Sequence, residues 1–237
     1  MKLPDFQDLI LFEDEDYVVI NKPPFLATLD ERFGGAPNIL RLARERYNDV
    51  QACHRLDKET SGALALARNP TAYRHLAMQF ENREVKKVYH AAAWGVHEYE
   101  GLRVERNIET TTKGKARLAF KGKPAVTLVR TLETFAKHTL LECQPITGRL
   151  HQIRLHLAYL QAPIIGDTMY GGEDFYLSSL KKKFNVKEGE EEQPFIKRFA
   201  LHAASLTFAR LDGTSLSMAA PYPKDFRVLI DTLRQYQ

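Results

Sequence analysis

Short apolar segments recur along this chain of 237 residues, and segments with helical spacing fall between them at irregular intervals. β-Branched and aromatic runs predict strands at residues 17–20, 126–129 and 139–141. Residues 62–67 are ambiguous by propensity and are interpreted as a short buried strand, and residues 85–96 as a longer strand. A doubly wound α/β fold requires regular alternation of strands and helices. We therefore expect an α+β fold with a mixed or mainly antiparallel central sheet and flanking helices.

Four segments are predicted to be helices. Asn38 is placed to cap a helix that runs to residue 47, and Asn69 with Pro70 forms a cap and first helical position for a helix that ends near residue 81. Ile153, Leu157 and Leu160 have helical spacing, which predicts a helix over 149–161 that closes before a proline. The same pattern predicts a C-terminal helix over 223–236.

No linker rich in Gly, Ser or Pro divides the chain, so we expect a single domain over 1–237 with a charged surface insertion at about 173–197. The N-terminus lacks the layout of a signal peptide, and no apolar run is long enough to cross a bilayer. We therefore expect a cytoplasmic protein without membrane contact, and we favour a monomer. Cys53 and Cys143 are not part of a Cys-x-x-Cys pair, so we expect two buried thiols without a disulfide or a metal.

The charge is distributed unevenly along the chain, whose net charge is only +4. Residues 1–35 carry eight acidic and three basic side chains, whereas residues 103–130 carry eight basic and two acidic ones. We call residues 103–130 the basic segment. It is a candidate surface for phosphate groups, although its charge alone is equally typical of a solvated strand face.

The most informative segment for chemistry is residues 54–62, which read His-Arg-Leu-Asp-Lys-Glu-Thr-Ser-Gly. Asp57 lies between two cations, Arg55 and Lys58, which would favour its ionised form if they lie close to it. An ionised carboxylate is the form that covalent nucleophilic catalysis requires. By itself, however, this segment is also typical of a salt-bridged turn that leads into a strand.

Taken with the rest of the chain, residues 54–62 resemble the signature of the RluA-type family of pseudouridine synthases. The second motif of that family, Lys-x-Tyr, is similar to residues 87–89, and the third is similar to Thr-Gly-Arg-Leu-His-Gln-Ile-Arg at 147–154. Weaker similarities occur around Asn21-Lys22-Pro23-Pro24, at 163–171, at 201–203 and at 221–226. Many members of the family carry an additional N-terminal RNA-binding domain of the S4 type, for which this chain has no room, so we expect the catalytic domain itself to hold the RNA.

The resemblance implies a pseudouridine synthase fold and the isomerisation of uridine in ribosomal or transfer RNA. This chemistry breaks the glycosidic bond, rotates the base and rejoins it through carbon 5, so it requires no redox cofactor, nucleotide or metal. The implied catalytic residues are Asp57 as nucleophile or base, Tyr89 stacked on the target base, and Arg154 as the ion-pair partner of Asp57. Arg55 would fill the space left by the flipped base. The implied RNA-contacting residues are Arg55, His54, Arg149, His151, Gln152, Lys113, Lys115 and Arg117.

Two other functions fit parts of the pattern. Asp57, His54, Asp167 and His202 are potential ligands of a metal-dependent phosphodiesterase, but their spacing matches no familiar metal motif. A non-catalytic RNA-binding module on the same fold is the second alternative. It is disfavoured because Asp57, Tyr89 and Arg154 are all present.

Overall fold

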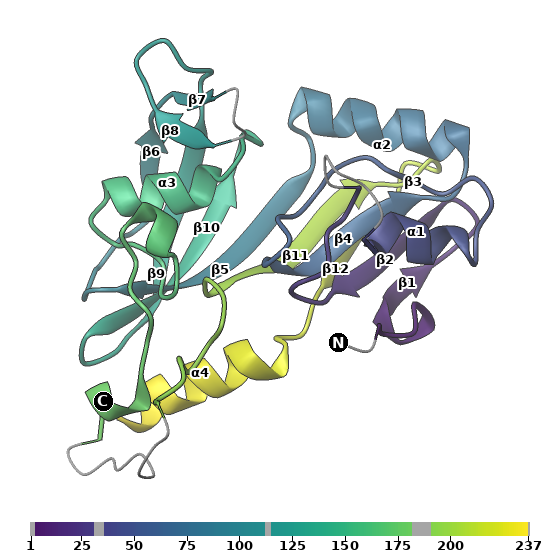
Figure 1. The fold of residues 1–237 in the computed structure, drawn as a ribbon. Coiled ribbons are helices and arrows are strands. Elements are labelled where there is room, and N and C mark those ends of the chain that lie inside the picture. Colours follow the sequence, from purple (N-terminus) through teal and green to yellow (C-terminus); the bar gives the residue numbers. More distant parts are fainter. Residues whose placement is uncertain (1–2, 31–35, 112–114, 182–190, 237) are drawn as a thin grey trace. The chain divides into compact units, whose positions relative to one another are not determined.

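The computed structural model describes residues 3–30, 36–111, 115–181 and 191–236, and its contacts divide the chain into two compact units (Figure 1). The first unit comprises Met1–Tyr89 and His202–Pro223, and the second comprises His90–Leu201 and Lys224–Gln237. The chain passes from the first unit to the second within one strand, β5 (Lys86–Trp94). This division into two units does not test the prediction of a single catalytic domain, which therefore stays a prediction.

The first unit is built on a mixed sheet. Strand β2 pairs antiparallel with β1 on one side and with β4 on the other. Strand β3 pairs antiparallel with the C-terminal end of β4, and β11 pairs parallel with its N-terminal end. Strand β12 pairs antiparallel with β11. The strands of this sheet are β1 (Ile10–Glu13), β2 (Tyr17–Lys22), β3 (Gln51–Ala52), β4 (Ser61–Ala67), β11 (Leu201–Ala209) and β12 (Ser215–Ala219). A short 3-10 helix, η1 (Gln7–Leu9), precedes β1.

Strand β4 is the ambiguous segment of the sequence, and all seven of its residues are buried. Its side chains alternate between the two faces of the sheet, as expected for a period of two residues. Leu64 and Leu66 enter one apolar cluster, whereas the alanines at 63, 65 and 67 enter another one that contains Ala72 and Leu76 of helix α2 (Pro70–Asn82). Small residues on one face therefore let this helix pack closely, and the predicted buried strand is confirmed.

Both predicted asparagine caps are confirmed. The Asn69 side chain accepts a hydrogen bond from the N–H of Ala72 at the start of α2, and that of Asn38 accepts one from the N–H of Arg41 at the start of α1 (Ile39–Arg44). Helix α1 ends three residues before the predicted boundary. The backbone past Arg44 continues as a turn in which Tyr47 still bonds back to Ala43 at 2.9 Å.

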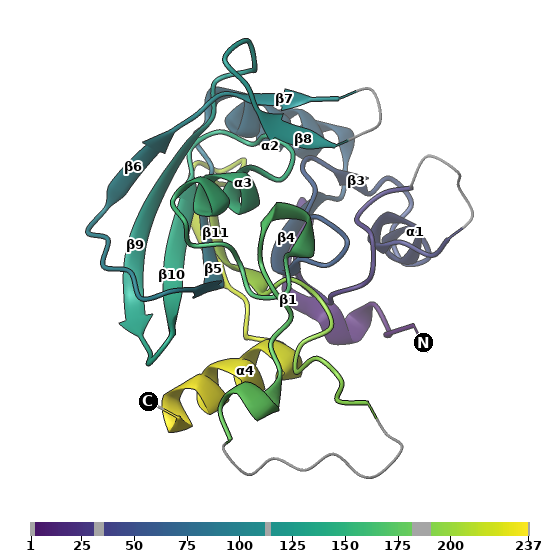
Figure 2. The same ribbon diagram turned by 60° about the vertical axis from the view of Figure 1, so that its left-hand side comes forward.

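The second unit contains the end of β5 followed in order by β10 (His138–Pro145), β9 (Val126–Thr134) and β6 (Leu102–Glu105). Strand β9 pairs antiparallel with both β10 and β6. A separate two-stranded ribbon, β7 (Ile108–Thr110) with β8 (Ala116–Leu118), lies at one end of this unit beyond helix α3 (Gln152–Tyr159) in both Figure 1 and Figure 2. With these two sheets, the predicted α+β class is confirmed.

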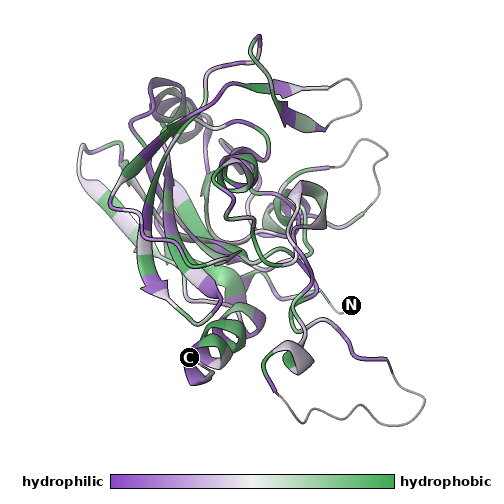
Figure 3. Cartoon of the chain, turned by 90° about the vertical axis from the view of Figure 1, so that its left-hand side faces the viewer, coloured by the Kyte–Doolittle hydropathy of each residue, from purple (hydrophilic) through white to green (hydrophobic). Residues whose placement is uncertain are grey.

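Two of the predicted helices lie in the second unit. Helix α3 begins at Gln152, three residues after the predicted start, because His151 takes a left-handed conformation with φ 53°. Helix α4 (Lys224–Gln235) buries Phe226, Leu229, Ile230 and Leu233, and Figure 3 shows its hydrophobic and hydrophilic sides. Two short 3-10 helices, η2 (Thr168–Tyr170) and η3 (Leu177–Ser179), follow α3.

The predicted surface insertion at 173–197 is described at its two flanks only, because residues 182–190 lie outside the described part of the chain. The flanks carry Phe175, which is fully buried, and Ile196, which is 1% exposed. These flanks therefore contribute apolar side chains to the core of the second unit.

Candidate functional site

The loop that carries Asp57 runs from the end of β3 to the start of β4 and is fixed on both sides of this residue. The preceding Leu56 is buried, its N–H donates to the hydroxyl of Thr28 at 3.1 Å, and the same hydroxyl donates to the carbonyl of Leu56 at 3.1 Å. On the other side, the N–H of Thr60 donates to the carbonyl of Asp57 at 3.0 Å and closes a turn. The backbone of Asp57 is therefore held in one place while its side chain remains partly exposed.

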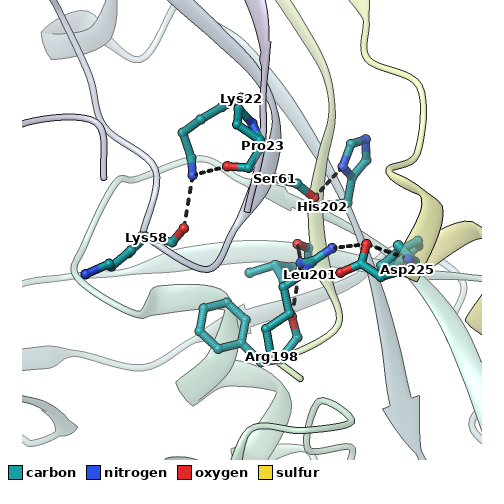
Figure 4. Close-up of polar contacts among 10 residues, drawn as sticks. Lys22, Pro23, Lys58, Ser61, Arg198, Leu201, His202 and Asp225 are labelled. Atoms are coloured by element: carbon teal, nitrogen blue, oxygen red, sulfur yellow. Dashed lines mark hydrogen bonds and ion pairs between the residues drawn. The ribbon is translucent and has the colours of Figure 1, made fainter. Parts of the chain in front are cut away.

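A buried ammonium group joins this loop to the loop after β2. The Lys22 side chain donates to the carbonyl oxygens of Pro23 and Lys58 at 2.9 and 3.1 Å (Figure 4), and to that of Leu26 at 2.8 Å. Lys22 is fully buried, and a buried cation is tolerated only when such acceptors replace its water. No role was predicted for Lys22. The signal in the sequence was a lysine at the end of an apolar strand, next to two prolines.

The Thr-Ser-Gly end of the motif locks β4 to β11. Gly62 has φ 116°, and a Cβ atom at this position would lie 2.1 Å from the carbonyl oxygen of Ala203. The neighbouring Ser61 hydroxyl bonds to Nδ1 of buried His202 at 2.9 Å (Figure 4), and Nε2 of the same ring bonds to the carbonyl of Ala220 at 3.0 Å. Since a carbonyl only accepts, Nε2 carries the proton and Nδ1 accepts from Ser61.

His54, a predicted RNA contact, is partly buried in the first unit. Its Nε2 accepts a hydrogen bond from the N–H of Ala65 at 3.1 Å, and its ring stacks on Phe80 with centroids 4.4 Å apart. Burial, with a smaller contribution from the positive charge of Lys87, lowers the pKa of His54 to about 3, so the ring is neutral. Burial also raises the pKa of the neighbouring Cys53 to about 12, which keeps this free thiol protonated.

Tyr89 lies on β5 and is partly buried against the apolar cluster that contains Leu56 and Leu64. The pKa of its hydroxyl is raised far above the usual value of 10, first by burial and second by the negative charge of Asp57. Tyr89 therefore packs against the cluster that contains Leu56, the neighbour of Asp57, within the reach of the Asp57 charge, and its hydroxyl stays protonated. Arg55 lies two residues before Asp57 in the same loop, and its side chain is exposed.

Arg154 lies on α3 in the second unit, where Asp167 holds it. Its Nε and Nη2 donate to the two carboxylate oxygens of Asp167 at 2.6 and 2.7 Å, and both side chains are at most 6% exposed. The guanidinium carbon also lies 4.2 Å from the ring centroid of Phe199 and 4.8 Å from that of Tyr170. A bidentate ion pair between two rings keeps this cation in one orientation. No role in isomerisation was predicted for Asp167, and the predicted pairing of Arg154 with Asp57 stays a prediction.

The turn before α3 is held by the amide of Gln152, which is 4% exposed. Its oxygen accepts from the Thr147 hydroxyl at 2.7 Å and from the N–H of Arg149 at 3.0 Å. Its nitrogen donates to the carbonyl of Val126 and to the hydroxyl of Thr127, each at 2.9 Å. These four bonds fill the capacity of an amide side chain. The predicted RNA contact of Gln152 would require one of them to break.

Two further predicted RNA contacts, Arg149 and His151, lie in the same turn. Arg149 is partly exposed and its Nε donates to the carbonyl of Pro124 at 3.1 Å. His151 lies 2.7 Å from the Tyr170 hydroxyl through its Nδ1, and this hydroxyl donates to the carbonyl of Ala116 at 3.1 Å. Nδ1 of His151 is therefore the donor in that pair.

The basic segment contributes three predicted RNA contacts. Lys113 lies outside the described residues. Lys115 is the first described residue after that gap, and it is exposed. Arg117 on β8 is exposed as well and pairs with Glu109 on β7 at 2.8 Å. An exposed pair of this kind stabilises the ribbon little and leaves the guanidinium accessible to another anion.

Two general findings concern the described part of the chain. Its His, Cys, Asp and Glu side chains form no group of three or more that is placed to hold a metal ion. Its helices are all too short or too polar to cross a bilayer.

Comparison with known proteins places these motifs in one family. A sequence profile described as RNA pseudouridylate synthase matches residues 16–159, which is more than half of the chain. The ribosomal large subunit pseudouridine synthase D of Neisseria meningitidis serogroup A is 33% identical over 240 residues, which cover 95% of this chain and 61% of that protein. The ribosomal large subunit pseudouridine synthase C of Vibrio cholerae is 32% identical over 238 residues, which cover 99% of this chain and 72% of that protein. The chain thus spans about three fifths of the length of the first relative.

Solved structures support the same assignment. Human RNA pseudouridylate synthase domain containing 4 superposes with a TM-score of 0.77 at 28% identity, covering 97% of this chain and 95% of the human one. Human RNA pseudouridylate synthase domain containing 1 superposes with a TM-score of 0.70 at 24% identity and shows the fold alone. The predicted pseudouridine synthase fold is therefore confirmed.

Proposed function

Because this chain belongs to the RNA pseudouridylate synthase family, we propose that it converts uridine in RNA to pseudouridine in place. The observation that carries this proposal is that the first unit holds Asp57 on a fixed backbone and Tyr89 against the cluster that contains the neighbouring Leu56. The charge of Asp57 reaches the Tyr89 hydroxyl and, after burial, helps to raise its pKa. An anion on a fixed backbone and a phenol that stays protonated suit a reaction that moves one bond and one proton.

The reaction is balanced without a co-reactant. The bond between N1 of uracil and C1′ of the ribose breaks, the base rotates, and a bond between C5 and C1′ forms. The proton on C5 is released and N1 gains one, so the composition of the nucleotide does not change. Asp57 acts as the nucleophile or base, whether on the sugar, on the base or on a sugar proton.

Three other side chains complete the proposed site. Tyr89 stacks on the target base, and its hydroxyl assists the late proton transfer. Arg154 pairs with Asp57 and keeps it ionised, while Asp167 and the two flanking rings fix the orientation of the guanidinium. The exposed Arg55 replaces the base that is flipped out of the RNA.

The substrate that we propose is ribosomal RNA in the cytoplasm, acted on by a monomer. The two bacterial relatives described above are named for the large ribosomal subunit, which supports ribosomal RNA over transfer RNA. The test is to incubate the purified chain with transcribed large-subunit ribosomal RNA and with transfer RNA, and to map pseudouridine by chemical labelling and reverse transcription. Formation at discrete sites in ribosomal RNA supports the proposal. Tight RNA binding without conversion of either RNA would favour the non-catalytic module instead.

Replacing Tyr89 by phenylalanine is expected to separate binding from turnover. Tyr89→Phe keeps the ring, so RNA affinity should persist, but turnover should fall by about 100-fold because a positioned proton donor contributes on that order. Because the raised pKa keeps this hydroxyl protonated, the wild type should not lose activity through tyrosine ionisation below pH 10. Pseudouridine formation at saturating RNA measures the effect, and Tyr73→Phe in the same unit is the matched control. Full activity of both Tyr89→Phe and Tyr89→Leu would make the residue structural.

Removing three cations of the basic segment is expected to weaken RNA binding and its dependence on salt. For single-stranded RNA, each lost phosphate contact lowers the slope of log K against log salt by about 0.7. The combined replacement of Lys113, Lys115 and Arg117 by alanine should lower it by up to about 2, less if Glu109 already neutralises Arg117. Titrations at several salt concentrations measure the slope, with Arg44→Ala as a control for loss of charge. An unchanged slope would place the RNA elsewhere.

A further inference from the structure

The turn between β8 and β9 exposes a phenylalanine completely. Phe120 is 98% exposed, whereas the next most exposed large hydrophobic side chain in the described part of the chain, Val96, is 55% exposed. Single exposed hydrophobic residues are common on protein surfaces, so this exposure carries no conclusion by itself. The structure of the turn and the charges around it provide two independent observations.

The turn that presents Phe120 is held by three hydrogen bonds and by close packing of its glycine. Gly122 donates its N–H to the carbonyl of Ala119 at 2.9 Å, and Ala119 donates its own to the carbonyl of Asn107 at 3.0 Å. The side-chain amide of Asn107 donates in return to the carbonyl of Phe120 itself at 3.0 Å. A Cβ atom on Gly122 would lie 2.5 Å from the backbone of Ile108, so the turn is packed directly on β7. The backbone that presents the ring is therefore held in place, so binding has to order the side chain and not the turn.

Within the described part of the chain, the two lysines next to Phe120 have no acidic partner. The basic segment has only two acidic side chains, and these pair with Arg103 and Arg117. Lys121 and Lys123, on either side of Gly122, are exposed, and no carboxylate lies within 4 Å of them in the described residues. An exposed aromatic ring beside two cations without a carboxylate partner has the chemistry that single-stranded nucleic acids recognise, with stacking for the base and charge for the phosphates.

The base of this turn is packed against the helix that carries Arg154. Ile108, Ala116 and Ala125 form an apolar cluster with Leu155 of α3. Leu155 follows Arg154 directly in the helix. The turn and the proposed catalytic arginine therefore share one packed support within the second unit, which would keep a bound RNA in register with Arg154.

We propose that Phe120 stacks on an unpaired base of the RNA substrate while Lys121 and Lys123 contact the phosphates beside it. This inference rests on the proposed function insofar as the ligand is RNA. It adds a binding residue, and it assigns to the turn a preference for single-stranded over double-stranded RNA. A ring at the tip of a loop stacks on any base, so the contact contributes affinity and positioning with little sequence preference.

The test compares Phe120→Leu, which keeps the apolar character, with Phe120→Trp, which keeps the stacking. We expect Phe120→Leu to bind a single-stranded oligonucleotide about tenfold more weakly, with an unchanged salt slope and a raised KM at constant kcat. Phe120→Trp should restore the affinity, and its additional fluorescence should be quenched when the RNA binds. Lys121→Gln with Lys123→Gln should instead lower the salt slope, and Val96→Ala should change nothing.

Several results would overturn the inference. Wild-type affinity and KM in Phe120→Leu would do so, and so would unquenched fluorescence in Phe120→Trp. A loss of self-association in Phe120→Leu, with RNA binding intact, would make the ring a contact between two copies of the chain. Quenching and affinity are measured without turnover, so they would support the inference even if no RNA were converted. Conversion with an unchanged KM would overturn the inference and leave the proposed function standing.

Discussion

Asp57→Asn is expected to leave a folded protein that binds RNA and forms no pseudouridine. Asparagine has nearly the same shape as aspartate, and the backbone of this loop is held by Thr28 and Thr60 independently of the carboxylate. The amide can neither attack carbon nor accept a proton at neutral pH, so the step assigned to Asp57 has no substitute. We therefore expect turnover to fall by several orders of magnitude, while stability and RNA affinity stay close to those of the wild type.

The measurement is pseudouridine formation under single-turnover conditions, together with thermal unfolding and RNA titration of the same preparation. Asp49→Asn, which neutralises an exposed aspartate of the same unit, is the matched control and should behave as the wild type. Turnover of Asp57→Asn within tenfold of the wild type, a barrier change of only about 1.4 kcal/mol, would refute the assignment.

The second large effect is expected at the buried ion pair of the second unit. Arg154→Ala leaves Asp167 with an uncompensated charge in a site where both side chains are almost fully buried. Breaking such a pair on one side costs roughly 3–5 kcal/mol of unfolding free energy. We therefore expect a large drop in the denaturant midpoint together with a loss of catalysis. Arg149→Ala, whose side chain is partly exposed and bonded to a single carbonyl, should mainly weaken RNA binding.

Two further variants distinguish a structural role of Arg154 from a role at Asp57. Asp167→Asn keeps the arginine but weakens the contact that orients it, so kcat should fall even in denaturant-free buffer where the variant is fully folded. Arg154→Lys keeps a charge but cannot form the bidentate contact, and should resemble Asp167→Asn. If both variants fold and retain wild-type kcat, Arg154 acts only in packing and its proposed pairing with Asp57 is wrong.

The sequence was sufficient where local chemistry decides the structure. Asn38 and Asn69 mark the starts of their helices because a side-chain oxygen three residues before an unpaired N–H is a local contact. The candidate residues Asp57, Tyr89 and Arg154 were found from motifs in a fixed order along the chain, and finding them requires no distance between side chains. The start of α3 was placed three residues too early, because the left-handed backbone of His151 and the bonds of Gln152 to β9 are not visible in the helical spacing of the sequence.

By itself, then, the sequence determined the α+β class, the caps, and the membership of Asp57 and Tyr89 in one set of motifs. Only the tertiary structure decided that Lys22 closes the Asp57 loop, that His202 receives the Ser61 hydroxyl, and that Asp167 holds Arg154. These partners are 36, 141 and 13 residues apart in the sequence. Pattern and propensity act over a few residues, whereas the partner of a buried charge or hydroxyl is selected by which backbone and side-chain atoms the packed fold brings within hydrogen-bonding distance.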